Sequence, residues 1–230
     1  MRAHDTRARA RARAHTHTHT HTHTHTHTHT HTNSAGLDPR NEDKNKFSNV
    51  RVFDSTRVKL STVNVDPSSD YINANWVKAP DGHKQYVAAQ APIPETFEDF
   101  WRMVWELKSS RIVMLTKEVE KGSVKCDRYW PDKTSSPPQP RLRYGDIVVS
   151  VDTAKSMGPF ILRRFTLQRN GEERTVKQFC FTAWPEEGVP TDAGDLIDLQ
   201  HAVYTAADQG DDNGAPTVVH CSSGVGRTGV

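Results

Sequence analysis

The chain has 230 residues, 34% of them hydrophobic and 25% charged, which suffices for one globular domain and is short for two. No apolar run approaches the ~18 residues of a membrane span, so no membrane segment is predicted. The formal charge of +2 is misleading, because residues 1–32 hold five Arg and one Asp and leave 25 basic against 27 acidic residues. This slightly acidic body argues against a nucleic-acid partner. Three cysteines form no even disulfide framework and favour a reducing compartment.

Residues 1–36 form a low-complexity tail, in which Arg alternates with Ala over 7–14 and His with Thr over 15–32. The tail has no apolar face that could support a core, so we expect it to be disordered and folded structure to begin near Leu37. A dinucleotide repeat in the gene would encode both alternations. The alternative is divalent-metal binding by the His side chains, although we assign no metal site.

Strands and helices alternate after the tail. Short β-rich stretches are predicted over 47–60 and 70–91. Thr96-Phe97-Glu98-Asp99 has the form of a capping box and opens a helix that continues to Lys108. Apolar residues at helical spacing predict that one face of this helix lies in a core: Phe97, Phe100, Trp101, Val104 and Trp105.

The second half of the chain is predicted to be richer in strands. Residues 111–115 read as a buried strand, 134–141 as a surface loop, and 146–151 as another strand. Asn170-Gly171 separates two strand-like stretches and suits the positive φ angles of a type I′ hairpin turn. A second helix is predicted over 192–207. This mixture predicts an α/β or α+β domain.

The candidate catalytic residues follow the short apolar strand Thr217-Val218-Val219. They are Cys221 and Arg227, which are separated by five residues. Seven residues can wrap backbone N–H groups around one phosphate while a sulfur lies beneath it and a guanidinium beside it. We therefore predict Cys221 as nucleophile and Arg227 as the group that binds phosphoryl oxygens bidentately. The loop backbone is predicted to bind the same phosphate: Ser222, Ser223, Gly224, Val225 and Gly226.

Two further features are expected to activate the sulfur of Cys221. A helix beginning near Arg227 would direct its positive dipole end at the loop and lower the pKa of the thiol. Thr228 can donate a hydroxyl hydrogen bond to the sulfur and ease its departure. The alternative is a lone buried cysteine, which the adjoining strand, glycines, Arg and hydroxyl disfavour.

The run from His220 to Gly229 resembles the signature of the classical protein tyrosine phosphatases, and the resemblance covers about residues 37–230. Lys44-Asn45-Lys46-Phe47 resembles their phosphotyrosine-recognition loop, which makes the pocket deep and favours tyrosine over serine. Phosphatases of dual specificity share the Cys-x5-Arg loop but lack that recognition loop. The resemblance implies a central, highly twisted mixed sheet flanked by helices, phosphotyrosine-containing proteins as partners, and hydrolysis through a phosphocysteine intermediate without a metal or cofactor.

The acid loop departs from the family pattern. It usually carries Trp-Pro-Asp, whereas this chain has Trp184-Pro185-Glu186, so the resemblance implies Glu186 as general acid. The extra methylene displaces the proton donor, and a misplacement of about 1 Å can cost ~10²-fold in rate. We therefore expect slow catalysis. Glu187 offers a second carboxylate that we rank behind Glu186.

The recognition loop also departs, with Phe47 where the family has Tyr and Asn49 where some members have Asp. Phe47 is expected to stack on phosphotyrosine, and Asn49 to hydrogen-bond a peptide backbone more weakly than a carboxylate. Glu120 is expected to pair with and orient Arg227, with a solvated surface charge as the alternative. Further supporting roles are implied for three residues: His220, Lys125 and Trp184.

Domains of this family continue beyond the signature through helices and a glutamine-bearing loop, so we expect residues 37–230 to be a partial catalytic domain that lacks its C-terminal helices. The principal alternative to an enzyme is a pseudophosphatase that binds phosphotyrosine without turning it over, and a third is a nonfunctional fragment. A cytoplasmic location is expected, either alone or as the cytoplasmic part of a longer membrane protein.

Overall fold

The computed structural model describes residues 32–79, 82, 85–190, 192–207 and 214–229. The expected disorder of the Arg-Ala and His-Thr repeats therefore lies almost wholly outside the described residues. A short helix, α1 (Ser34–Leu37), begins three residues before Leu37, where we predicted that folded structure starts. The Asp54 carboxylate accepts hydrogen bonds from the backbone N–H groups of Ser34 and Ala35, at 2.7 and 2.9 Å. In the part of the chain that is described, no helix is both long and apolar enough to cross a membrane.

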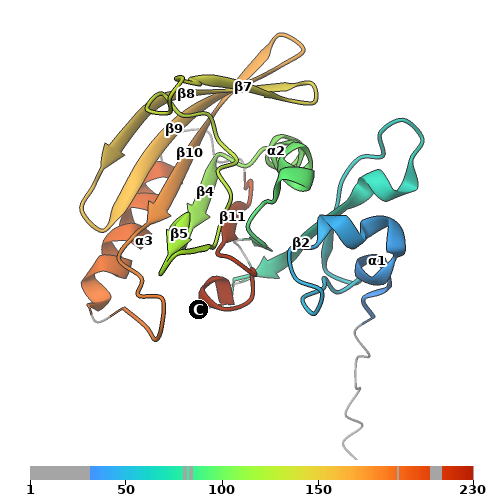
Figure 1. The fold of residues 1–230 in the computed structure, drawn as a ribbon, viewed down its shortest axis with the longest axis horizontal. Coiled ribbons are helices and arrows are strands. Elements are labelled where there is room, and N and C mark those ends of the chain that lie inside the picture. The colour runs from blue at the N-terminus through green and yellow to red at the C-terminus, as the bar shows by residue number, and fades with distance from the viewer. Residues whose placement is uncertain (1–31, 80–81, 83–84, 191, 208–213, 230) are drawn as a thin grey trace, which may run out of the picture. The chain divides into compact units, whose positions relative to one another are not determined.

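A nine-stranded mixed sheet runs through the described residues, in the order β1-β2-β3-β11-β4-β10-β9-β8-β7 (Figure 1). The four central strands β3, β11, β4 and β10 are parallel, and the outer pairings are antiparallel. This sheet with its flanking helices confirms the predicted fold class. The strands are β1 (Arg57–Lys59), β2 (Tyr71–Lys78), β3 (Gln85–Ala89), β4 (Arg111–Met114), β7 (Arg141–Tyr144), β8 (Ile147–Ser156), β9 (Phe160–Arg169), β10 (Glu172–Phe181) and β11 (Thr217–His220).

The remaining elements are short or lie against the sheet. A separate two-stranded hairpin consists of β5 (Val119–Glu120) and β6 (Ser123–Val124). The two longer helices are α2 (Phe97–Glu106) and α3 (Ala193–Ala207). Short 3-10 helices are η1 (Pro39–Lys44), η2 (Pro67–Asp70), η3 (Pro94–Thr96) and η4 (Arg227–Gly229).

Side chains of the central strand β4 alternate between two cores, because successive residues of a strand point to opposite faces. Ile112 and Met114 pack in the larger core, which also holds Trp101 of α2. Val113 packs in the smaller core with Leu199 of α3. All four residues of β4 are buried, as expected for a parallel strand that is covered on both faces. The sheet therefore lies between α2 and α3.

The hairpin between β9 and β10 confirms the turn predicted from Asn170-Gly171. Both residues have positive φ angles, 51° and 80°, and the flanking residues Arg169 and Glu172 are paired. Glycine has no Cβ to oppose this conformation and asparagine tolerates it better than most residues. The two strands reach directly to the turn, at Arg169 and Glu172.

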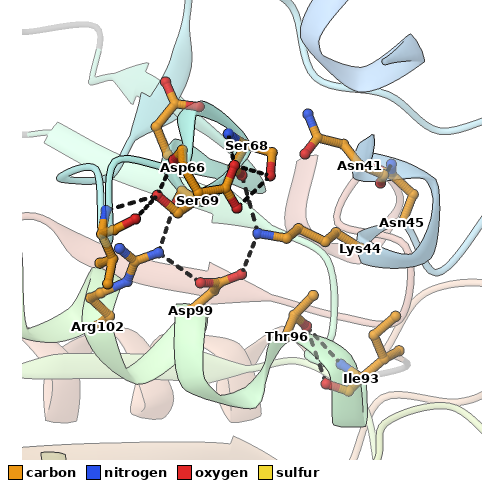
Figure 2. A network of polar contacts seen from close by, with 12 residues as sticks. Asn41, Lys44, Asn45, Asp66, Ser68, Ser69, Ile93, Thr96, Asp99 and Arg102 are labelled. Atoms are coloured by element: carbon orange, nitrogen blue, oxygen red, sulfur yellow. Dashed lines mark hydrogen bonds and ion pairs between the residues drawn. The ribbon is translucent and has the colours of Figure 1, made fainter. Parts of the chain in front are cut away.

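The predicted capping box at the start of α2 is wrong. Pro94 begins the turn η3, and the Thr96 hydroxyl closes that turn through the backbone N–H and carbonyl of Ile93, at 3.1 and 3.2 Å. Thr96 therefore makes no side-chain cap to α2. Asp99 instead accepts from Lys44 at 2.9 Å and from Arg102 at 2.7 Å (Figure 2). One cation from the same helix and one that is distant in sequence have taken the carboxylate that the local pattern assigned to the cap.

Candidate active site

The candidate site lies where the four parallel strands end. Parallel strands present their carboxyl ends at one edge of a sheet, where α/β proteins commonly bind ligands. Gln90 follows β3, Thr116 and the β5–β6 hairpin follow β4, the acid loop from Thr182 follows β10, and the Cys221 loop follows β11. Four segments that are distant in sequence therefore converge.

Cys221 lies at the bottom of its loop and is only 4% exposed. The backbone N–H of Gly224 donates to its sulfur at 3.3 Å. Gly224 has a φ of +79°, and a Cβ there would lie 2.5 Å from the carbonyl oxygen of Ala89 on β3. Only glycine fits this close approach, which explains one of the two glycines in the loop.

Burial by itself would raise the pKa of the Cys221 thiol, but hydrogen bonding to Thr228, Gly224 and Gly226 outweighs burial and the pKa is lowered. The Thr228 hydroxyl acts at looser geometry than a full hydrogen bond, since its buried oxygen has no partner of standard geometry. Within the described residues only the 3-10 turn η4 follows the loop, not an α-helix. Hydrogen-bond donors of the loop and of Thr228 account for the lowered pKa.

Arg227 is fixed by a bidentate ion pair with Glu120 of β5. Its Nη1 and Nη2 lie 2.7 and 2.8 Å from the two carboxylate oxygens, and Nη1 also donates to the carbonyl of Leu115 at 3.0 Å. Burial opposes the ionised carboxylate, yet hydrogen bonds from Arg227, Lys117 and Thr116 lower the pKa of Glu120 to about 2. The structure places Glu120 as an internal partner of Arg227, not as a solvated surface charge.

The acid loop lies over Arg227, whose Nη2 donates to the carbonyls of Pro185 and Glu186 at 2.9 and 3.4 Å. The Glu186 carboxylate lies 3.0 Å from Lys125 and 3.8 Å from Lys121, and its side chain is 22% exposed. Glu187 is 86% exposed and pairs with Lys121 at 3.0 Å. The structure therefore directs Glu186, and not Glu187, toward the site.

A cavity of about 180 Å³ joins these groups. Its lining includes Cys221, Arg227 and Glu186. The other lining residues are Thr116, Glu120, Lys125, Ser222, Ser223 and Gly226. Seven residues predicted for the site, including the two of the recognition loop, do not line this cavity: Phe47, Asn49, Trp184, His220, Gly224, Val225 and Thr228.

Trp184 and His220 do not line the cavity but contact residues that do. The Trp184 indole is buried, donates to the carbonyl of Gly188 at 3.2 Å, and lies 5.9 Å from the guanidinium carbon of Arg227. Its contacts therefore brace the acid loop. His220 is fully buried, and burial lowers its pKa to about 4. The ring is consequently neutral near pH 7.

The recognition loop is attached to the sheet and to α2. Gln90 accepts from the backbone N–H of Lys46 at 3.0 Å and donates to the carbonyl of Lys44 at 2.9 Å. The ammonium of Lys44 reaches Asp99 on α2 and the carbonyl of Ser68 (Figure 2). Phe47, which directly follows Lys46, is 37% exposed. The backbone of the loop is thus fixed while its aromatic side chain faces solvent.

Two residues of the site were missed in the sequence. Thr116 lines the cavity and donates to Glu120 at 2.9 Å, and Gln90 holds the recognition loop as described. Both are polar residues within two positions of the end of a parallel strand, and that position was the available signal.

Comparison with known proteins agrees with this geometry. The family model described as "Protein-tyrosine phosphatase" matches residues 41–230. The chain is 44% identical over 191 residues to the receptor-type tyrosine-protein phosphatases eta and S of Gallus gallus. The matched segment is 82% of this chain but only 13% and 12% of those two proteins, so the chain spans a small part of their length. The chain belongs to the protein-tyrosine phosphatase family.

Proposed function

We propose that this domain hydrolyses phosphotyrosine in proteins through a phosphocysteine intermediate. The observation that carries the proposal is the shared cavity of Cys221, Arg227 and Glu186. These are the nucleophile, the cation and the proton donor that phosphoryl transfer to an enzyme side chain requires. Both relatives are described as tyrosine-protein phosphatases, which agrees with the proposal.

In the first step the Cys221 thiolate attacks phosphorus, the S–P bond forms, and the bond from phosphorus to the phenolic oxygen breaks. Glu186 gives its proton to the departing oxygen. Arg227 stabilises charge on the phosphoryl oxygens. Its Nη hydrogens are taken by Leu115, Glu120 and Pro185, and no acceptor for Nε is found among the described residues. We infer that Nε–H binds one phosphoryl oxygen and that Nη2 exchanges the Pro185 carbonyl for a second.

In the second step water attacks phosphorus, the S–P bond breaks, and Cys221 leaves as thiolate. Glu186, now a carboxylate, accepts the proton of the attacking water, and phosphate departs. The groups that lower the pKa of Cys221 also make it a better leaving group, Thr228 among them. Cys221 and Glu186 thereby return to the protonation states in which they began the cycle.

We expect turnover to be slow, because the acid is a glutamate where the family usually has aspartate. Glu186→Asp should raise kcat by up to about 10²-fold, which is the cost of a misplacement near 1 Å. The matched change Glu187→Asp should leave kcat within about twofold, because Glu187 is 86% exposed and pairs with Lys121. An unchanged kcat in folded Glu186→Asp would refute the inference that the extra methylene limits the rate.

The test of function is phosphate release from a phosphotyrosyl peptide by the purified 230-residue chain, with Cys221→Ser as the comparison. Release that Cys221→Ser abolishes, while far-UV circular dichroism and the unfolding midpoint stay unchanged, supports the proposal. Saturable binding of the peptide without release would favour the binding-only pseudophosphatase. Release that persists in Cys221→Ser would refute the assignment of the nucleophile.

The preference for tyrosine is proposed to come from the recognition loop, since Phe47 has an exposed ring able to stack on a phosphotyrosyl side chain. The same peptide with phosphoserine should not be hydrolysed. Asn49→Asp should tighten peptide binding, because a carboxylate accepts backbone hydrogen bonds more strongly than an amide. Unchanged affinity would mean that Asn49 does not contact the peptide.

Phosphotyrosine-containing proteins are therefore the proposed partners, in a cytoplasmic location. The three cysteines are free thiols, and the catalytic one must remain reduced to react. Loss of activity on mild oxidation and its recovery with a thiol reductant would support a reducing compartment.

A further inference from the structure

A chain of buried hydrogen bonds runs from β9 to the nucleophile. Arg163 Nη1 donates to Gln178 Oε1 at 2.8 Å, and Gln178 Nε2 donates to the Tyr129 hydroxyl oxygen at 2.8 Å. That hydroxyl lies 2.8 Å from His220 Nε2, and His220 Nδ1 lies 3.2 Å from the carbonyl oxygen of Cys221. The three middle residues are fully buried, so water does not compete for their hydrogen bonds. We call these five residues the relay.

The direction of the relay is fixed at its outer end. Arginine carries five N–H donors and no acceptor. The bond to Arg163 therefore requires the amide oxygen of Gln178 to face Arg163 and the amide NH2 to face Tyr129. The sulfur of Met114, a weak acceptor, lies 4.0 Å from the same NH2 and agrees with this orientation.

The orientation of Gln178 then decides which ring nitrogen of His220 carries the proton. Burial raises the pKa of Tyr129 well above its usual value, so the phenol keeps its single proton. Because its oxygen accepts from Gln178, the proton is directed to His220 Nε2. His220 is neutral near pH 7 and carries one N–H. With Nε2 as acceptor, that N–H is on Nδ1 and is donated to the carbonyl of Cys221.

The inner end of the relay holds the peptide that follows the nucleophile. The C=O and N–H groups of a trans peptide point in opposite directions. Fixing the carbonyl of Cys221 therefore also fixes the direction of the Ser222 N–H, one of the groups proposed to bind phosphate. Ser222 lines the cavity beside Cys221. The relay thus reaches the phosphate site without contacting substrate.

We propose that Arg163 is a positioning residue of the active site, whose donor-only side chain on β9 sets the tautomer of His220 and the orientation of the Cys221–Ser222 peptide. In the order of the sheet, β10 and β4 separate β9 from β11, so Arg163 acts from outside the catalytic loop (Figure 1). The effect on rate rests on the proposed function, but the direction of the relay does not.

An acceptor at residue 163 would reverse the hydrogen bonds of the relay as far as His220 and remove the last one. Glutamate there would turn the amide NH2 of Gln178 outward, Tyr129 would donate to the amide oxygen, and His220 Nε2 would carry the proton. Unprotonated Nδ1 would then face the Cys221 carbonyl as a second acceptor, and the two would repel. Lysine at 163 is still a pure donor and should preserve the direction.

The experiment is 15N NMR of the imidazole nitrogens in the 230-residue chain, which distinguishes the two neutral tautomers. The native chain and Arg163→Lys should show the Nδ1–H form of His220, and Arg163→Glu the Nε2–H form. Arg164→Glu is the matched control, because Arg164 is exposed and pairs only loosely with Asp152, at 3.6 Å. It should leave the tautomer unchanged.

The kinetic consequence is measured separately. In Arg163→Glu, kcat/KM for an aryl phosphate should fall about tenfold, as expected for loss of one hydrogen bond from the transition state, and Arg163→Lys should stay within about twofold. A folded Arg163→Glu that keeps the Nδ1–H form overturns the proposal. If that variant does not fold, Tyr129→Phe decides: a mixture of tautomers supports the relay, and an unchanged Nδ1–H form overturns it. A native chain with the expected tautomer but no phosphatase activity would overturn the proposed function and leave the relay intact.

Discussion

Glu120→Gln is the perturbation whose effect follows most directly from the structure. The Glu120 carboxylate accepts from both Nη atoms of Arg227, from the Thr116 hydroxyl at 2.9 Å and from the Lys117 backbone N–H at 3.1 Å. Glutamine keeps the shape but turns an NH2 toward one of these donors and leaves the buried guanidinium unneutralised. Removing one partner of a buried ion pair costs about 3–5 kcal/mol.

The lowered pKa gives a second value for the same interaction. A fall from 4.5 to about 2 in the folded state corresponds to roughly 3 kcal/mol, at about 1.4 kcal/mol for each pH unit. Because the folded pKa is the lower one, this stability is fully present well above pH 4.5 and is lost as the pH falls toward 2. By pH 3.5 the loss should reach about 1.4 kcal/mol. Glutamine does not titrate and contributes no such dependence.

The assay is urea unfolding of the native chain and of Glu120→Gln at pH 7 and at pH 3.5. The difference in free energy of unfolding should be about 3 kcal/mol at pH 7 and smaller by about 1.4 kcal/mol at pH 3.5. Glu172→Gln is the control, because Glu172 is 63% exposed, pairs with Arg174 at 3.1 Å and should contribute less than about 1 kcal/mol. A difference that does not change with pH, or that equals the control, would refute the reasoning.

Three further changes test other parts of the site. Asp99→Asn removes the charge that holds Lys44, so KM for a phosphotyrosyl peptide should rise several-fold with little change in kcat; a lower kcat at constant KM would contradict this. Gly224→Ala forces a Cβ into the space of a backbone carbonyl and should lower the unfolding free energy by at least about 1–3 kcal/mol, measured in urea. Thr228→Val removes a group that lowers the pKa of Cys221, so alkylation by iodoacetamide should require higher pH; an unshifted pH profile would exclude a role for the hydroxyl.

Local patterns in the sequence were sufficient wherever a residue's role depends on its chain neighbours. The Asn170-Gly171 turn, the helix over α2 and the mixed α/β class are confirmed, because backbone geometry and hydrophobic period act over a few residues. The conformation of the seven residues from Cys221 to Arg227 likewise depends mainly on neighbouring residues, since a phosphate-sized loop is closed within that span. The family follows from this loop and the order of the other segments.

Local reasoning failed where other groups competed for the same side chains. Thr96 and Asp99 fit a capping box, but Ile93 in the preceding turn takes the Thr96 hydroxyl, and both Arg102 of the same helix and Lys44, which is distant in sequence, take the Asp99 carboxylate. The contact with Lys44 cannot be read from spacing. The same is true of Gln178, whose amide orientation depends on Arg163 across the β9–β10 pairing.

The sequence by itself therefore determined the extent of the Cys221 loop, the fold class and the family. Glu120 and Glu186 were already implied by the resemblance, whereas only the tertiary structure showed that Thr116 lines the cavity and that Gln90 holds the recognition loop. The physical reason is the parallel centre of the sheet: β3, β4, β10 and β11 are brought side by side by long crossover connections, and their carboxyl ends meet at one edge.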